Sequence, residues 1–125
     1  MLQKPFRLRR SVDVKRVRQQ GKGWRHPLAI LLVTKSDQDV SRFAFIASRG
    51  VGKAVVRNRA RRLLRESVRL HMDEVMAGWD CLFIARAATA GASFADVETA
   101  VLQLLSRAHL LDHNAPERHE EQSNT

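Results

Sequence analysis

Apolar runs separated by polar segments predict three strands along the chain. Residues 28–34 are rich in Leu and β-branched side chains, as expected of a buried strand, and residues 42–48 form a second run with alternating faces. Because the polar residues 35–41 separate these two runs, we expect them to pair as an antiparallel hairpin. Residues 81–85, with the sequence CLFIA, predict a third buried strand.

Three further segments place apolar residues at three- and four-residue steps, which is typical of amphipathic helices. The first covers residues 11–21 with Ser11 as its cap, the second covers about 55–76, and the third begins at a Ser93 cap. The glycines within 21–23 predict a turn before the first strand. The pattern as a whole predicts helices packed on a small sheet.

The second predicted helix has two very different faces. At 3.6 residues per turn its apolar face holds Val56, Ala60, Leu63, Ser67 and Leu70, and its opposite arc holds Arg57, Asn58, Arg61, Arg62, Arg65 and Arg69. Like charges four residues apart destabilise an isolated helix by about 0.2–0.5 kcal/mol per pair, so we expect an outside partner to offset the repulsion. Guanidinium groups bind phosphate oxygens bidentately and stack on unpaired bases, which favours a polyphosphate partner over a merely solvated face.

The charge balance points in the same direction. The 125-residue chain carries a net charge of +9, and its last fourteen residues hold four carboxylates against Arg118, which leaves +12 on residues 1–111. A field of that strength favours nucleic-acid binding that is sensitive to salt. We expect residues 1–111 to form one α/β domain of RNA-binding type, and residues 112–125, which are acidic and poor in apolar side chains, to be a disordered tail.

Several classes of protein are disfavoured by what the sequence lacks. No stretch approaches ~18 uncharged apolar residues, so we expect no membrane association, and the single Cys81 fits a reducing cytoplasm. Residues 47–54, ASRGVGKA, imitate a phosphate loop, but Ala54 stands where that loop needs a hydroxyl, so no nucleotide cofactor is expected. The five histidines have no zinc spacing and the carboxylates are scattered, so we expect no catalytic residue in this chain and assign no metal site.

One segment resembles the signature of a known family. Residues 52–66 read GKAVVRNRARRLLRE, with Pro27 before the first strand, Arg42 opening the second and Asp80 preceding the third. This arrangement, over roughly residues 7–110, resembles the bacterial ribonuclease P protein subunit. The resemblance implies an α/β (α+β) two-layer sandwich: a small mixed sheet, three helices and a left-handed β-α-β crossover, like a domain of a small-subunit ribosomal protein.

The resemblance also implies a function. Such a subunit works with a catalytic RNA to remove the 5′ leader from precursor tRNA, so both RNAs are expected partners. The RNA performs the hydrolysis with Mg²⁺, which is expected to be bound mainly by the RNA. The residues expected to face the catalytic RNA are Lys53, Arg57, Asn58, Arg59, Arg61, Arg62, Arg65 and Arg69. Of these, Arg59 lies near the edge of the apolar face and is expected to be partly structural.

In this family the leader occupies a cleft between the first helix and the sheet, which aromatic side chains commonly line. The corresponding candidates here are Val14, Lys15, Arg18 and Arg42. Val14 stands where Phe is usual and Arg18 where another aromatic is frequent. We therefore expect leader contact in this chain to depend more on charge than on stacking, and to be more sensitive to salt.

Two other interpretations are open at this stage. A ribosomal or assembly factor that binds structured RNA without affecting cleavage would need the same charge and the same helix. A DNA-binding protein is disfavoured, because the helix offers few side chains besides Arg to distinguish base edges and no helix-turn-helix precedes it.

Overall fold

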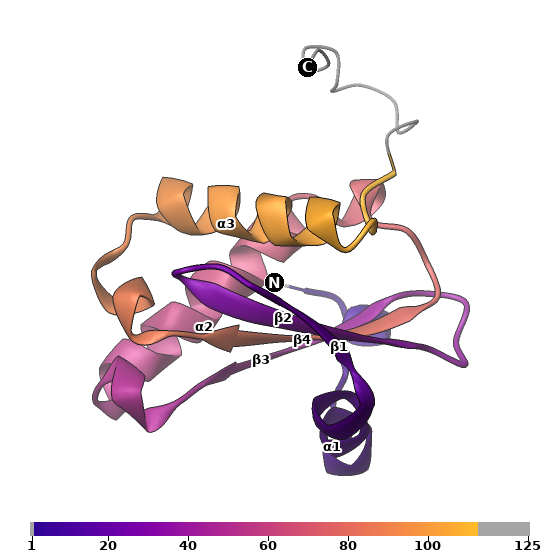
Figure 1. The fold of residues 1–125 in the computed structure, drawn as a ribbon, viewed down its shortest axis with the longest axis horizontal. Coiled ribbons are helices and arrows are strands. Elements are labelled where there is room, and N and C mark those ends of the chain that lie inside the picture. The colour runs from indigo at the N-terminus through magenta and orange to yellow at the C-terminus, as the bar shows by residue number, and fades with distance from the viewer. Residues whose placement is uncertain (1, 113–125) are drawn as a thin grey trace.

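The computed structural model describes residues 2–112, which form a four-stranded sheet with helices on both faces (Figure 1). The strands are β1 (Lys22–Arg25), β2 (Ala29–Lys35), β3 (Arg42–Ala47) and β4 (Trp79–Ala85), in the spatial order β1-β2-β4-β3. The pairs β1–β2 and β2–β4 are antiparallel and the pair β3–β4 is parallel, so the sheet is mixed, as predicted. Of the predicted tail, residues 112–125, all but Asp112 lie outside the described residues.

Three α-helices cover this sheet unequally. They are α1 (Ser11–Gln20), α2 (Ala54–Arg69) and α3 (Phe94–Arg107), and short 3₁₀ turns occupy Lys4–Phe6 (η1), Arg49–Val51 (η2), Met72–Glu74 (η3) and Ala87–Gly91 (η4). Helices α2 and α3 lie side by side on one face, and α1 lies on the other (Figure 1). Ser93 caps α3 by accepting a hydrogen bond from the Asp96 N–H, as predicted, whereas the cap of α1 is Arg10 rather than Ser11.

The predicted hairpin between residues 28–34 and 42–48, which form β2 and β3, is wrong, because β4 lies between these two strands. Five of the seven β4 residues are buried, against two of six in β3, so β4 is the strand that benefits most from the centre of the sheet. This order places β3 at an edge. The chain passes from β3 through α2 to the parallel neighbour β4, which is a β-α-β crossover; its left-handed sense stays a prediction.

Strand β1 was predicted as a turn, and Gly21 before it and Gly23 within it explain the error. A Cβ at Gly21 would collide with the Val17 carbonyl oxygen of α1, and a Cβ at Gly23 would lie 3.0 Å from a Leu32 methyl group of β2. These glycines therefore allow close approach of the chain to α1 and to β2, which local sequence does not reveal.

The buried face of α2 is rotated from the predicted one. Its buried residues are Ala60, Leu64, Ser67 and Val68, whereas Leu63 is only partly buried and Leu70 is 45% exposed. The helix has two neighbouring apolar stripes. The sheet takes the stripe with Leu64 and Val68, and Leu63 lies toward Phe94 at the start of α3.

Helix α2 also ends at Arg69, seven residues before the predicted end. Beyond it, the His71 ring lies between two carboxylates, with 2.8 Å from Nδ1 to Glu74 and 2.8 Å from Nε2 to Glu98 of α3. Burial lowers the pKa of His71, but hydrogen bonds to the two carboxylates outweigh that effect and raise it. A contact with α3, not a Gly or Pro signal, therefore fixes where the chain leaves the helix.

A buried ion pair holds α1 on the sheet. The fully buried Asp80 of β4 accepts hydrogen bonds from Arg42 at 2.9 and 2.8 Å and from Arg16 of α1 at 2.6 Å. Arg16 also donates to the Thr34 hydroxyl at 2.8 Å. Burial would raise the pKa of Asp80, but the hydrogen bonds from Arg42 and Arg16 outweigh it and hold that pKa below its ordinary value.

Replacing Leu64 with Ala is predicted to lower the free energy of unfolding by about 2–5 kcal/mol, because the cavity would lie in the core between α2 and the sheet. The matched change Leu63→Ala removes the same atoms from a partly exposed side chain and should destabilise less. Urea unfolding of both variants measures the difference. A larger loss for Leu63→Ala would contradict the observed facing of α2.

Asp80→Asn is predicted to lower the free energy of unfolding at pH 7 by about 3–5 kcal/mol, because two guanidinium groups lose the buried charge that they share. Since the pKa of Asp80 is lower in the folded than in the unfolded chain, its contribution is present above about pH 4 and is lost as the pH falls further. Denaturant unfolding between pH 7 and pH 3 should therefore show the gap between wild type and variant shrinking with acid. A gap that widens would refute this role.

Candidate RNA-binding surfaces

Helix α2 displays most of its cations around two sides of its axis. Lys53, Asn58, Arg59, Arg62 and Arg69 are exposed, and Arg57, Arg61 and Arg65 are half-buried where α2 runs beside β3. The last three, four residues apart on one flank of the helix, are called the α2 stripe below. The structure therefore brings the predicted RNA-facing residues onto one helix but divides them between two flanks.

The contacts of these arginines separate binding from structural roles. Arg59 donates to the carbonyl oxygens of Ala90 and Ala92 at 3.2 and 3.1 Å, which ties α2 to η4 and supports the expectation that Arg59 is partly structural. Arg61 donates to the Asn58 side-chain oxygen. Within residues 2–112, the only α2 arginine paired with a carboxylate is Arg69, which contacts Glu66 at 2.8 Å. The remaining guanidinium groups keep donors for an outside anion.

A glycine sets where α2 begins. Gly52 has a φ of +140°, a conformation that side chains strain, and a Cβ there would lie 3.2 Å from Val56. Its carbonyl oxygen accepts a hydrogen bond from Arg57 at 2.9 Å. The turn at Gly52 thus starts the helix and orients the first arginine of the α2 stripe.

A cleft of about 300 Å³ lies along the outer edge of β3, which residues 7 and 8 partly cover through a hydrogen bond from the Leu8 N–H to the Phe43 carbonyl oxygen at 2.8 Å. Val14 of α1, Phe45 and Ile46 contribute apolar walls, and Arg7, Arg9 and Arg65 contribute cations; these six residues define the β3 cleft. The Arg65 guanidinium lies 5.9 Å from the centre of the Phe45 ring, a cation–π distance. The cleft therefore combines stackable apolar surface with positive charge, which suits a single-stranded nucleic acid.

An apolar row continues from this cleft across the sheet. Ile46, Ile84 and Ile30 are register partners on β3, β4 and β2, and all three are half-buried on the face that α1 only partly covers. At the end of the row, Arg25 of β1 is the register partner of Ile30. The open part of the sheet thus links the β3 cleft to β1.

The four residues predicted to contact the leader lie in different surroundings. Val14 lines the β3 cleft, and Lys15 and Arg18 are exposed on α1. Arg42 donates to Asp80 at 2.9 and 2.8 Å and does not line the β3 cleft, so its guanidinium helps to hold α1 on the sheet. Sequence reasoning missed the contribution of Arg7, Arg9 and Phe45 to the cleft, and did not place Arg65 there. Arg65 was detectable only as a member of the helix, because its approach to Phe45 is a tertiary contact.

Clusters of metal ligands and membrane-spanning helices are both absent from the described residues. Between residues 2 and 112 no group of three or more His, Cys, Asp or Glu side chains is placed to hold a metal ion. No helix in the same region has the length and apolarity needed to span a membrane.

Comparison with known proteins gives a consistent result. The family model named Ribonuclease P matches residues 2–109. The chain is 38% identical over 109 residues to the ribonuclease P protein component of Herpetosiphon aurantiacus, covering 87% of this chain and 89% of that one. It is 39% identical over 108 residues to that of Roseiflexus castenholzii, covering 86% and 88%.

Solved structures agree in fold. The RNase P protein from Thermotoga maritima superposes with a TM-score of 0.73 at 30% identity, covering 81% of this chain and 96% of that one. The RNase P protein of Staphylococcus aureus superposes with a TM-score of 0.78 at 22% identity, covering 86% and 99%. The three helices and the mixed sheet of this chain match these folds.

Arg61→Ala and Arg59→Ala are predicted to behave as opposites, although both remove one guanidinium from α2. Arg61→Ala should change the free energy of unfolding by less than about 0.5 kcal/mol and reduce the salt dependence of RNA binding, log K against log[salt], by about 0.7–0.9. Arg59→Ala should mainly lower stability, because it breaks two hydrogen bonds to the segment before α3. Thermal unfolding and filter binding at several salt concentrations separate the two effects. An unfolded Arg61→Ala protein would contradict the assignment.

Proposed function

The chain belongs to the ribonuclease P protein family, and on that premise we propose that its two basic surfaces bind two different RNAs. The α2 stripe and its neighbours bind the catalytic RNA, and the β3 cleft binds the 5′ leader of precursor tRNA. As a ribonuclease P protein component, the chain is a subunit of a tRNA-processing endoribonuclease in which the RNA carries out catalysis.

The assignment of α2 to the catalytic RNA rests on unneutralised charge. Arg57, Arg61 and Arg62 make no ion pair with any described carboxylate, and Lys53 stands exposed at the start of the helix. A helix can present such a row at fixed spacing to successive phosphates of a folded RNA, with bidentate contacts from each guanidinium. Asn58, which already accepts from Arg61, would then orient that arginine.

The assignment of the β3 cleft to the leader rests on its mixed character. Phe45 and Ile46 offer surfaces for unpaired bases, while Arg7, Arg9 and Arg65 approach the same cleft and suit the phosphates between them. Lys15 and Arg18 of α1 extend the positive rim. Because Val14 supplies no ring, we propose that leader binding is carried more by charge than by stacking. We propose that Arg42 is a positioning residue, which holds α1 beside the cleft.

On this proposal the protein acts by placing RNA and not by bond breaking. Its cations reduce the mutual repulsion of phosphates from the catalytic RNA and the precursor, so the two can approach at lower Mg²⁺ concentration. The described residues offer no cluster of metal ligands, and Asp80 is already bound by arginines, so they do not fit a resident Mg²⁺. We assign Mg²⁺ to the RNA and derive no step of the protein's action through it.

A cytoplasmic location is part of the proposal, since both RNA partners would be met there. Cys81, the single cysteine, is fully buried, and burial raises the pKa of its thiol. An unreactive thiol of this kind agrees with a reducing compartment.

The function is tested by cleavage of precursor tRNA with a bacterial ribonuclease P RNA at low Mg²⁺, with and without this protein, and with the protein alone. Stimulation that requires the RNA supports the proposal, and cleavage by the protein alone would contradict it. Tight RNA binding without stimulation would instead favour a structural RNA-binding protein.

Arg65→Ala is predicted to weaken binding of the assembled complex to a precursor with a leader by about 5- to 30-fold, which corresponds to about 1–2 kcal/mol for the lost phosphate and cation–π contacts. Affinity for mature tRNA, which has no leader, should be unchanged. Arg65→Lys keeps the charge and should recover only part of the loss, because Lys lacks the planar group that covers Phe45. Equal losses for precursor and mature tRNA would refute the leader assignment.

A further inference from the structure

A further group of cations gathers at the turn between β1 and β2, on the sheet edge opposite β3. Arg107, at the end of α3, donates to the Arg25 carbonyl oxygen at 2.8 Å, and Arg86, just after β4, donates to the His26 carbonyl oxygen at 3.3 Å. Consecutive residues lie about 3.8 Å apart between Cα atoms, so both guanidinium groups reach the same short piece of backbone. Arg25, Arg86 and Arg107 are called the turn cluster below.

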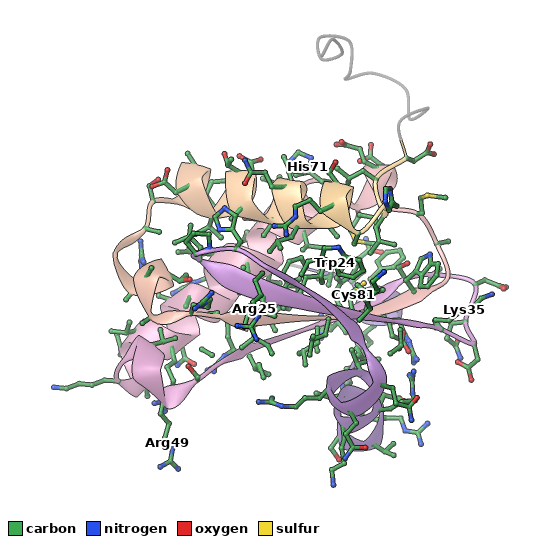
Figure 2. All side chains as sticks on the ribbon, viewed as in Figure 1. Trp24, Arg25, Lys35, Arg49, His71 and Cys81 are labelled. Carbon is green, nitrogen blue, oxygen red and sulfur yellow. The ribbon has the colours of Figure 1, made fainter. Side chains whose placement is uncertain are left out.

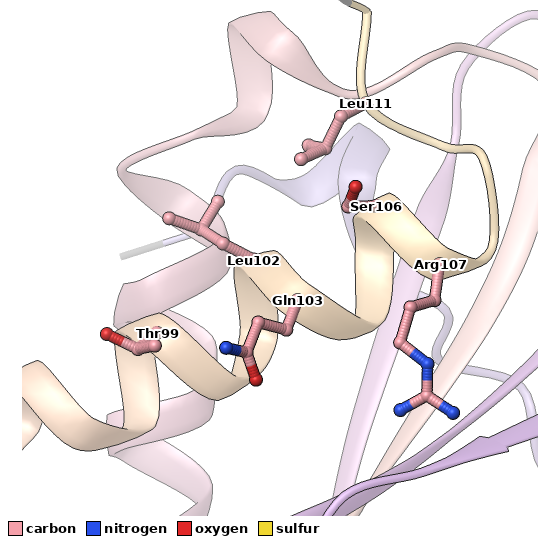
Figure 3. Close-up of a pocket in the computed structure, with 6 residues that line it drawn as sticks. All are labelled: Thr99, Leu102, Gln103, Ser106, Arg107 and Leu111. Carbon is pink, nitrogen blue, oxygen red and sulfur yellow. The ribbon is translucent and has the colours of Figure 1, made fainter. Parts of the chain in front are cut away.

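Backbone geometry puts this cluster at an open edge. His26 and Ala29 exchange both backbone hydrogen bonds, at 2.9 and 3.2 Å, so the preceding Arg25 carbonyl points away from β2. Arg107 meets that carbonyl from α3, and Figure 3 shows its side chain extending from the helix toward the strands. Each fixed guanidinium uses one of its five N–H groups on the carbonyl and keeps the others for a ligand.

The cluster is positively charged without local compensation. All three arginines are exposed, and none pairs with a carboxylate among residues 2–112. Two of them are already oriented by the backbone, which reduces the entropy lost when they bind an anion. Three positive side chains at one turn, with no paired carboxylate among the described residues, attract the phosphates of a nucleic acid.

The turn cluster lies on the path that leaves the β3 cleft. The row of Ile46, Ile84 and Ile30 crosses the open face of the sheet, and Arg25 follows Ile30 in register on β1. Crossing from β3 to β1 takes three strand spacings of about 4.8 Å, or roughly 14 Å. At a rise of about 3.4 Å per stacked nucleotide, some four nucleotides of single strand cover that distance.

We propose that Arg25, Arg86 and Arg107 form a second anchor for single-stranded RNA, which binds the phosphates of leader nucleotides beyond those held in the β3 cleft. The inference rests on the proposed leader function of that cleft. The contacts are to phosphates, so the anchor is indifferent to leader sequence and is engaged only by leaders long enough to cross the sheet.

The test compares precursors with two leader lengths on the assembled complex of this protein with catalytic RNA. A leader of about two nucleotides is too short to cross the sheet, and one of about ten is longer than the crossing at the stacked rise of 3.4 Å. The variants are Arg86→Gln and Arg107→Gln, singly and together, because Gln removes the charge and keeps an N–H donor for the backbone carbonyl. Thermal unfolding checks that each variant folds.

Each substitution is expected to weaken binding of the long-leader precursor by about three- to tenfold and to reduce its salt slope by about 0.7, with no change for the short leader. Lys35→Ala is the matched control, because it also removes one exposed positive charge. Lys35 is the last residue of β2, at the end away from the β1–β2 turn, and Figure 2 labels it apart from Arg25. That control should affect neither precursor.

Four results would overturn the inference or its premise. Equal losses for both leaders would assign the turn cluster to the catalytic RNA instead. Unchanged binding in the variants, while wild type still gains affinity with leader length, would refute the second anchor and leave the cleft assignment standing. No gain in wild type from the two-nucleotide to the ten-nucleotide leader would also refute the second anchor, whereas no gain from either leader over mature tRNA would refute the leader function of the β3 cleft itself.

Discussion

The buried carboxylate of Asp80 is the interaction on which the arrangement of this molecule depends. It lies in the central strand and receives Arg42 from the edge strand β3 and Arg16 from α1, so a single charge connects the sheet to the helix that partly covers it. A buried carboxylate is tolerated only when hydrogen-bonded cations compensate its lost hydration. The contacts of Arg16 hold α1 near the Thr34 end of β2. Ile30, Ile46 and Ile84, at the other end of the sheet, therefore stay only half-buried. The surface proposed for the leader is therefore a consequence of where α1 is anchored.

The order of the strands determines where the β3 cleft lies. With β4 in the interior of the sheet, β3 is the outermost strand on its side, and its outer edge lies between α1 and α2, where residues 7 and 8 contact it at Phe43. The β3 cleft thus takes Val14 from one helix and Arg65 from the other, and Arg65 belongs at the same time to the α2 stripe. A precursor held at this edge is necessarily close to an RNA bound along α2, which is the geometry a subunit needs in order to bring substrate to a catalytic RNA.

The sequence predicted what depends on local pattern. The apolar runs gave β2, β3 and β4, the Ser93 cap gave the start of α3, and the density of arginines identified α2 as the RNA-facing helix, a role that stays a proposal. The errors arise where distant residues decide. The end of α2 depends on His71 meeting Glu98, and β1 depends on glycines that approach α1 and β2. Arg42 was a candidate for leader contact in the sequence, and only the fold shows its two hydrogen bonds to Asp80.

The most direct test of this account asks which RNA each surface touches. Cys81 is buried, so a cysteine introduced by Val14→Cys or Arg62→Cys can carry a photo-cross-linker alone, and the assembled complex can then be irradiated with precursor tRNA bound. We expect a cross-linker at position 14 to attach to leader nucleotides and one at position 62 to attach to the catalytic RNA. Cross-links from position 14 to the catalytic RNA, with none to the leader, would contradict it.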